Sequence, residues 1–158
     1  MNKSALRQAI LEQLRRELDR QVGAAHLARD EAISEESQPE NKWDTHSQEA
    51  AYLAEGQARL AAEIGASLTH YAAMALPDFA AGDAIAIGAL VELRGARGES
   101  AWYFIGPRAG GLEIQVDGRV VLVVTPQSPL GRQLVGRRVG DTLAVANRGG
   151  AQTIAAVL

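Results

Sequence analysis

The first half of the chain has the apolar spacing of amphipathic helices. Apolar residues recur three and four positions apart from Leu6 to Ala25, including Val22, and charged residues fill the positions between them. That spacing places one apolar stripe on a single face of a helix. A second stretch, from about Glu40 to Met74, repeats the pattern and is rich in alanine, which favours helix. The pattern predicts two long helices of similar length.

The segment between these helices contains a proline. Pro39 fixes its own φ and disfavours helix at the preceding residue, so the first helix must end before it. Ser37 and Glu40 have the spacing of a capping box at the start of the second helix. Two helices joined so closely are expected to pack antiparallel as a hairpin. At about 1.5 Å per residue, about 30 residues would give an arm roughly 45 Å long.

After Pro77 the pattern changes to short β-like runs separated by glycine-rich breaks. Strands are expected at Ala84–Ile87, Leu90–Leu93, Trp102–Ile105, Leu112–Val116, Val120–Val124, Asp141–Ala146 and Thr153–Leu158. The Asp117-Gly118 pair is typical of a hairpin turn, and one short helix is expected between Pro129 and Val135. The predicted fold class is α+β, with an N-terminal antiparallel coiled-coil hairpin (residues 1–76) and a C-terminal antiparallel β domain with a short helix (residues 77–158).

Composition narrows the class of protein. The chain is 47% hydrophobic and 22% charged, which is normal for a folded soluble protein. Its apolar runs fall short of the roughly 20 residues that span a bilayer, and its first twenty residues are too charged for a signal peptide. The absence of cysteine excludes a disulfide framework and a thiolate zinc site. We therefore expect a cytoplasmic protein with no membrane partner.

Charge is distributed unevenly along the chain. The net charge of −3 disfavours a nucleic-acid binder with a broad basic surface. Six carboxylates between Asp30 and Asp44 surround a single Lys42, so the acids crowd the predicted hairpin tip near residues 35–44. Such a cluster is most often only a solvated surface, but its position at a tip also suits a functional role.

Two stretches resemble the Gre family of bacterial transcript-cleavage factors. The longer one runs from Thr125 to Asp141 and reads TPQSPLGRQLVGRRVGD, which is similar to the family's Ser-Pro-x-(Gly/Ala)-Arg-x-Leu-(Ile/Val)-Gly-Lys stretch. The second is Glu40-Asn41 at the tip, followed by Glu55-Gly56 on the next helix. With the order of the two halves, the resemblance covers nearly the whole chain.

The resemblance implies a specific function. The C-terminal domain would have a fold similar to FK506-binding proteins and would dock on the rim of the secondary channel of bacterial RNA polymerase. The residues matched for this docking are Ser128, Pro129, Gly131, Arg132 and Leu134. The hairpin would enter the channel, where tip carboxylates share a Mg²⁺ ion with the polymerase so that it cuts its own backtracked RNA. The factor itself would be a monomer with no cofactor of its own and no intrinsic enzymatic activity.

The tip departs from the family pattern at one position. Glu40 matches the family's second acid, whereas Ser37 stands where an aspartate is expected. Glu36 is the nearest replacement, so Glu36 and Glu40 are the predicted tip carboxylates and metal ligands, with Glu35 and Asp44 as further candidates. Metal assistance needs donors held within a fraction of an ångström. Three alternatives stay open: helix capping alone, channel entry without cleavage, and stimulation of cleavage.

Two functions of other classes are weaker alternatives. A peptidyl-prolyl isomerase would need a nest of aromatic side chains. Trp102, Tyr103 and Phe104 are consecutive, so a strand would divide them between two faces. A dimeric coiled-coil adaptor is disfavoured by the break at Pro39, which favours folding back within one chain.

Overall fold

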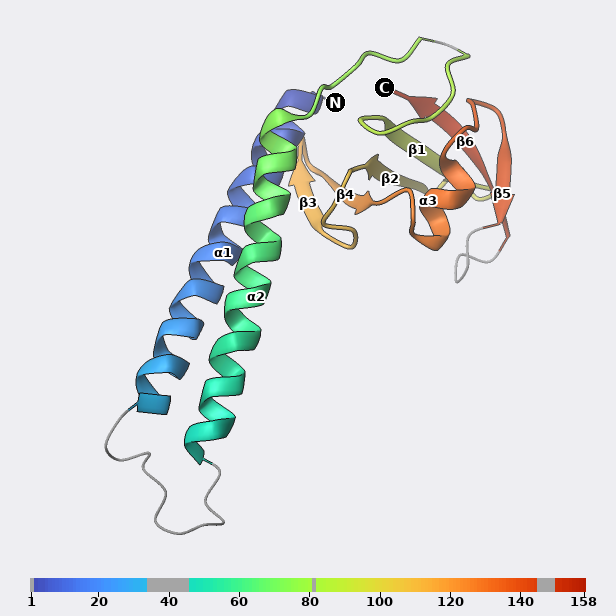
Figure 1. Ribbon diagram of the computed structural model, residues 1–158. Helices are drawn as coiled ribbons and strands as arrows, with labels where there is room; N and C mark the ends of the chain where they lie inside the picture. The colour runs from blue at the N-terminus through green and yellow to red at the C-terminus, as the bar shows by residue number, and fades with distance from the viewer. Residues whose placement is uncertain (1, 34–45, 81, 145–149) are drawn as a thin grey trace. The chain divides into compact units, whose positions relative to one another are not determined.

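The computed structural model describes residues 2–33, 46–80, 82–144 and 150–158. Two long helices, α1 (Lys3–Ile33) and α2 (His46–Ala73), precede the strands of a sheet (Figure 1). The chain divides into two compact units: Glu12–Thr69, and a second unit that joins Met1–Leu11 to His70–Leu158. The boundaries between these units fall inside α1 and α2. The predicted boundary between two functional domains, at residues 76 and 77, lies elsewhere and stays a prediction.

The Glu12–Thr69 unit contains most of both helices. The expectation of two long helices is confirmed, and the 31 residues of α1 correspond to a length of about 46 Å. Leu14 and Ala28 are buried on α1, whereas Val22 is 39% exposed. Its place in the predicted apolar stripe is therefore wrong. Beyond Leu14, Ala28 is the one buried residue of α1 among those whose burial is described, and it is small.

The second unit contains a six-stranded sheet with the order β3-β4-β2-β1-β6-β5. The strands are β1 (Leu90–Gly95), β2 (Ser100–Ile105), β3 (Glu113–Val116), β4 (Arg119–Val124), β5 (Thr142–Ala144) and β6 (Ala151–Val157). The short helix α3 (Pro129–Leu134) follows β4. The α+β class and the short helix are thus confirmed.

The sheet is mixed rather than wholly antiparallel, which corrects the prediction. Strands β2 and β4 pair in parallel, and the other four pairings are antiparallel. The reason is the order of the strands: the chain leaves β2, forms the outer strand β3, and turns back between them as β4. That turn is the predicted Asp117-Gly118 pair, where φ is 51° and 71° respectively, as a two-residue hairpin requires.

The expected strand at Ala84–Ile87 is not formed. Ile85 is buried, and its backbone N–H donates to the Arg137 carbonyl while its own carbonyl accepts from Gly136, both at 2.8 Å. The segment therefore bonds to the loop after α3 at one residue only, and Gly88 with φ of 91° then turns the chain away. A single paired residue makes no ladder, although the apolar alternation is that of a strand.

The two faces of the sheet have separate surroundings. Tyr103 belongs to a buried cluster with Val91, Leu93 and Leu134 of α3. Phe104, the next residue of β2, is also buried but lies outside that cluster. Successive strand residues alternate between faces, so the division of consecutive aromatic residues expected from the sequence is confirmed.

Within this unit the end of α2 is bonded to the segment after β2, and α1 is bonded to the residue after α2. The hydroxyl of Tyr71 donates to the carbonyl of Arg108 at 2.8 Å, and the ring is fully buried. A Cβ added at Gly106 would lie 2.1 Å from that hydroxyl, so the glycine makes room for the tyrosine. Burial raises the pKa of Tyr71. At the other helix, Arg7 donates to the Met74 carbonyl at 3.2 Å.

Candidate partner-binding surface

Ser128 shapes the start of α3. Its hydroxyl accepts the Gly131 N–H at 3.0 Å and donates to the Thr125 carbonyl at 2.8 Å. The side chain therefore satisfies an N–H that the helix leaves free at its first turn. Pro129 follows in the first helical position, where its missing N–H costs nothing. Both residues fix where the helix begins.

Gly131 permits a close approach between α3 and the preceding chain. A Cβ at this position would lie 1.9 Å from the Thr125 carbonyl oxygen and 2.8 Å from its carbon. Those atoms belong to the backbone, so no side-chain rotation could relieve the contact. Leu134, one turn later, is completely buried in the core. Four of the five predicted docking residues thus have a structural role in placing α3.

Arg132 is the remaining member of the predicted docking set, and its side chain is exposed. Arg138 is exposed as well, and no bond engages the side chain of either residue within the described part of the chain. Arg137 differs because its guanidinium donates to the carbonyls of Gln133 and Thr142, at 2.8 and 3.1 Å. Two of the three arginines near α3 are therefore available to a partner.

Apolar side chains accompany the two arginines. Val135 is 40% exposed and Val139 is 45% exposed. We call Arg132, Val135, Arg138 and Val139 the α3 surface. The two valines were not predicted to be exposed, because the residues after Leu134 were considered only as part of the stretch that resembles the Gre family. The sequence did contain an indication: the two valines stand among glycines and arginines, without the regular apolar spacing that would predict their burial.

A cavity of about 490 Å³ borders the beginning of the motif. Thr125, Ser128, Pro129 and Leu130 line it together with Gly110 and Gly111. Its lining is mainly apolar and includes Leu122. The beginning of α3 is therefore bordered by a hollow that can receive an apolar side chain.

The predicted tip lies outside the described residues. Glu35, Glu36, Ser37, Glu40 and Asp44 all fall in the segment from 34 to 45, so their role as tip carboxylates and Mg²⁺ ligands stays a prediction. Within the described residues, no group of three acidic, histidine or cysteine side chains could hold a metal ion. Nor does any helix in the described part have the length and apolar content needed to cross a bilayer.

Comparison with known proteins gives matches among solved structures only. No protein-family model matches the chain, and no curated protein matches it significantly. The chain is similar to the crystal structure of GreA factor homolog 1 (Gfh1) of Thermus thermophilus, with 23% identity over 95% of both chains and a TM-score of 0.38. It is also similar to Gfh1 of Thermus aquaticus, with 22% identity over 95% of this chain and 94% of that one, and a TM-score of 0.39. Another structure of the transcription factor Gfh1 matches at 22% identity over 94% and 93% of the two chains, with a TM-score of 0.40.

Proposed function

We propose that this protein is a Gre-like transcription elongation factor that binds bacterial RNA polymerase and inserts its acidic hairpin tip into the secondary channel. The observation that carries the proposal is the structural role of the residues from Ser128 to Leu134. The cap, the first-turn proline, the glycine in close contact and the buried leucine hold α3 in place. The motif then leaves one exposed cation, Arg132, in a fixed position.

The chemistry of the α3 surface supports a protein partner. Unpaired guanidinium groups bind carboxylates in a two-pronged geometry, and exposed valines beside them provide apolar contact. The partner surface would therefore be acidic with apolar side chains, which fits a protein better than it fits RNA. The length of α1, about 46 Å, supports a role in which the hairpin enters a channel.

The residues at the predicted tip decide whether the factor stimulates RNA cleavage or only occupies the channel. A serine at position 37 supplies no carboxylate, which favours a channel-binding regulator that does not stimulate cleavage or that competes with other channel-binding factors. If Glu36 replaces the missing acid, the factor stimulates cleavage by sharing a Mg²⁺ ion with the polymerase. In either form the protein binds no cofactor of its own.

Channel entry can be tested by crosslinking. A photoreactive phenylalanine derivative at Gln38, near the predicted tip, should crosslink to polymerase segments that line the secondary channel. The same group at Arg97, an exposed residue in the turn between β1 and β2, serves as a matched control and should crosslink elsewhere or not at all. Absence of channel crosslinks from Gln38 at saturating protein would refute insertion of the tip.

Cleavage is measured separately, on stalled complexes whose RNA has backtracked. A cleaving factor shortens the RNA, and Glu40→Ala and Glu36→Ala abolish the effect, whereas Asp19→Ala, which removes an exposed acid on α1, does not. Unchanged RNA length at saturating protein would leave channel entry intact as a function and eliminate cleavage stimulation.

A further inference from the structure

Helix α2 carries two seams, each made of residues that recur three and four positions apart. Such spacing places the members of a seam on one side of the helix. The residues of the first seam are all half-buried, as packing against α1 of the same unit would produce. They are Ala54, Gln57, Ala61, Ile64 and Leu68. This seam belongs to the hairpin itself.

The second seam lies one residue before the first and is exposed along its whole length. Its members are Glu49, Leu53, Gly56, Leu60 and Glu63. Leu53 is 55% exposed and Leu60 is 47% exposed, so the part of the chain that the structure describes does not cover them. A helix with two seams is typical of one that packs against two other helices. We call this second set the exposed seam.

Gly56 lies at the centre of the exposed seam, between the two leucines. A Cβ added there would have no atom within 4 Å, so packing within the described residues does not require a glycine. Glycine is nevertheless a poor residue for the interior of a helix. Its missing side chain leaves a hollow between Leu53 and Leu60, through which another helix can approach closely.

The exposed seam is complementary to itself. Its residue types read the same in both directions: Glu, Leu, Gly, Leu, Glu. A two-fold axis at Gly56 therefore places Leu53 of one copy near Leu60 of a second copy, with the two helices antiparallel. Tyr52 and Arg59 lie along one flank of the seam, and the same axis brings the guanidinium of each copy to the ring of the other. Both side chains are free to do so, since Tyr52 is 73% exposed and the side chain of Arg59 is 83% exposed.

The apolar area of this surface is near the minimum for a dimer. From their exposed fractions, Tyr52, Leu53 and Leu60 present roughly 300 Å² of apolar side chain on each copy. Because about 60% of an interface is apolar, two copies would bury roughly 1,000 Å² in all. That total is at the lower limit for a specific contact between proteins. The dimer is therefore expected to be weak, with a Kd on the order of 10–100 µM.

We propose that the protein forms a weak antiparallel dimer in which the exposed seams of two α2 helices pack against each other at Gly56. The resemblance to Gre factors implied a monomer, and the dimer does not depend on polymerase binding. One consequence rests on the proposed function: a dimer covers one side of each hairpin, so a hairpin must leave the dimer before it enters a channel. The monomer is then the form that binds the polymerase.

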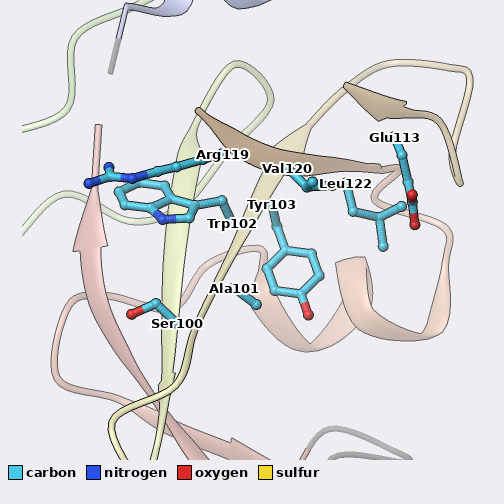
Figure 2. A pocket seen from close by; sticks show the side chains of 8 residues that line it. All are labelled: Ser100, Ala101, Trp102, Tyr103, Glu113, Arg119, Val120 and Leu122. Atoms are coloured by element: carbon cyan, nitrogen blue, oxygen red, sulfur yellow. The ribbon is translucent and has the colours of Figure 1, made fainter. Parts of the chain in front are cut away.

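The sheet has another hollow surface, but its charged groups already interact with one another. A cavity of about 400 Å³ is lined by residues of β2, β3 and β4 (Figure 2). The Arg119 guanidinium lies over the Trp102 ring, 5.2 Å from its centroid. Hydrogen bonding from Ser100 lowers the pKa of Glu92, and the charge of Arg119 lowers it further. The carboxylate of Glu113 also lines the cavity. The exposed seam is therefore the surface that lacks a partner.

Sedimentation equilibrium of the unmodified protein tests the dimer. Leu60→Lys places a charge in the exposed seam and should weaken the dimer at least ~10-fold. Ala62→Lys, the matched control, places the same charge at an exposed position on the opposite side of α2 and should dimerise like the unmodified protein. Circular dichroism at low concentration shows that both variants fold. A monomer up to ~500 µM, or equal association of the two variants, would overturn the proposal.

Salt and crosslinking give two independent readouts. The antiparallel arrangement brings Glu49 of one copy near Glu63 of the other, so raising the salt concentration from ~50 to ~500 mM should tighten the dimer. An affinity that falls with salt contradicts the arrangement. The chain has no cysteine, so Gly56→Cys introduces a single thiol at the two-fold axis, where two copies can form a disulfide. Ala62→Cys should crosslink far more slowly, and equal rates would contradict an axis at Gly56.

Discussion

Replacing Gly131 by alanine tests how α3 is held in place. The added Cβ would lie 1.9 Å from the Thr125 carbonyl oxygen, whereas ordinary contact begins at 3.4 Å. The difference, 3.4 − 1.9, requires a movement of 1.5 Å between two backbone segments. The carbonyl of Thr125 also accepts hydrogen bonds from the N–H and the hydroxyl of Ser128, at 3.0 and 2.8 Å, and that movement would break both.

The expected loss follows from these contacts. Each hydrogen bond contributes about 1 kcal/mol, and the weakened cap of Ser128 adds about 1 kcal/mol. Alanine recovers about 1 kcal/mol of helix propensity relative to glycine. The net destabilisation of Gly131→Ala is therefore about 2 kcal/mol. For a chain of this length that corresponds to a fall in Tm of about 4–8 °C, which thermal unfolding followed by circular dichroism can resolve.

Two matched glycines serve as controls. At Gly110 an added Cβ would meet the Thr125 side chain at 3.2 Å, and a methyl group can move aside, so Gly110→Ala should cost less than about 1 kcal/mol. At Gly56, on α2, nothing lies within 4 Å, and alanine should be neutral or stabilise by up to about 1 kcal/mol. If Gly131→Ala melts within the range of the two controls, the close approach between α3 and Thr125 is not what fixes the helix.

Three further changes have defined outcomes. Because burial raises the pKa of Tyr71 from its ordinary value of 10.0, the neutral tyrosine stabilises the fold below pH 10 and that stability is lost as pH rises further. Tyr71→Phe should lose about 1 kcal/mol at neutral pH, with its bond to Arg108, and show a smaller decline in Tm above pH 10; an unchanged alkaline decline would contradict this. Hydrogen bonding from Ser100 lowers the pKa of Glu92, so Ser100→Ala should raise that pKa in a carboxyl NMR titration and reduce the stability lost on acidification below pH 4.5; no change in the titration would refute the role of the hydroxyl. The side-chain oxygen of Gln57 is buried without a partner in the described part of the chain, so Gln57→Leu should stabilise the helix pair by about 1 kcal/mol and slow hydrogen exchange in α2, whereas faster exchange would show that the amide is needed.

Local patterns in the sequence predicted much of the fold. The spacing of apolar residues identified both long helices, and Asp117-Gly118 identified the hairpin turn, because these features depend on neighbours a few residues apart. The parallel pairing of β2 with β4 could not be predicted in this way. It depends on which strand of the hairpin, β3 or β4, lies next to β2, and the alternation within each strand is the same for either arrangement.

The candidate site shows a similar division. The motif from Ser128 to Leu134 was recognisable because a cap, a first-turn proline and a required glycine are fixed in sequence. Its exposed part was less apparent, since the valines at 135 and 139 are apolar residues that are nevertheless 40% and 45% exposed in the structure. The cavity at Arg119 and Trp102 was also missed. Those residues are 17 positions apart, and only the parallel register brings them together.

The affinity of the protein for bacterial core RNA polymerase tests the central claim most directly. With polymerase immobilised and binding followed by biolayer interferometry, the protein should bind saturably. The double variant Arg132→Glu/Arg138→Glu should bind about 10-fold more weakly, because reversing two exposed charges costs roughly 1–2 kcal/mol, and Arg97→Glu should bind like the unmodified protein. Absence of saturable binding, or equal affinity for all three proteins, would contradict polymerase docking through the α3 surface.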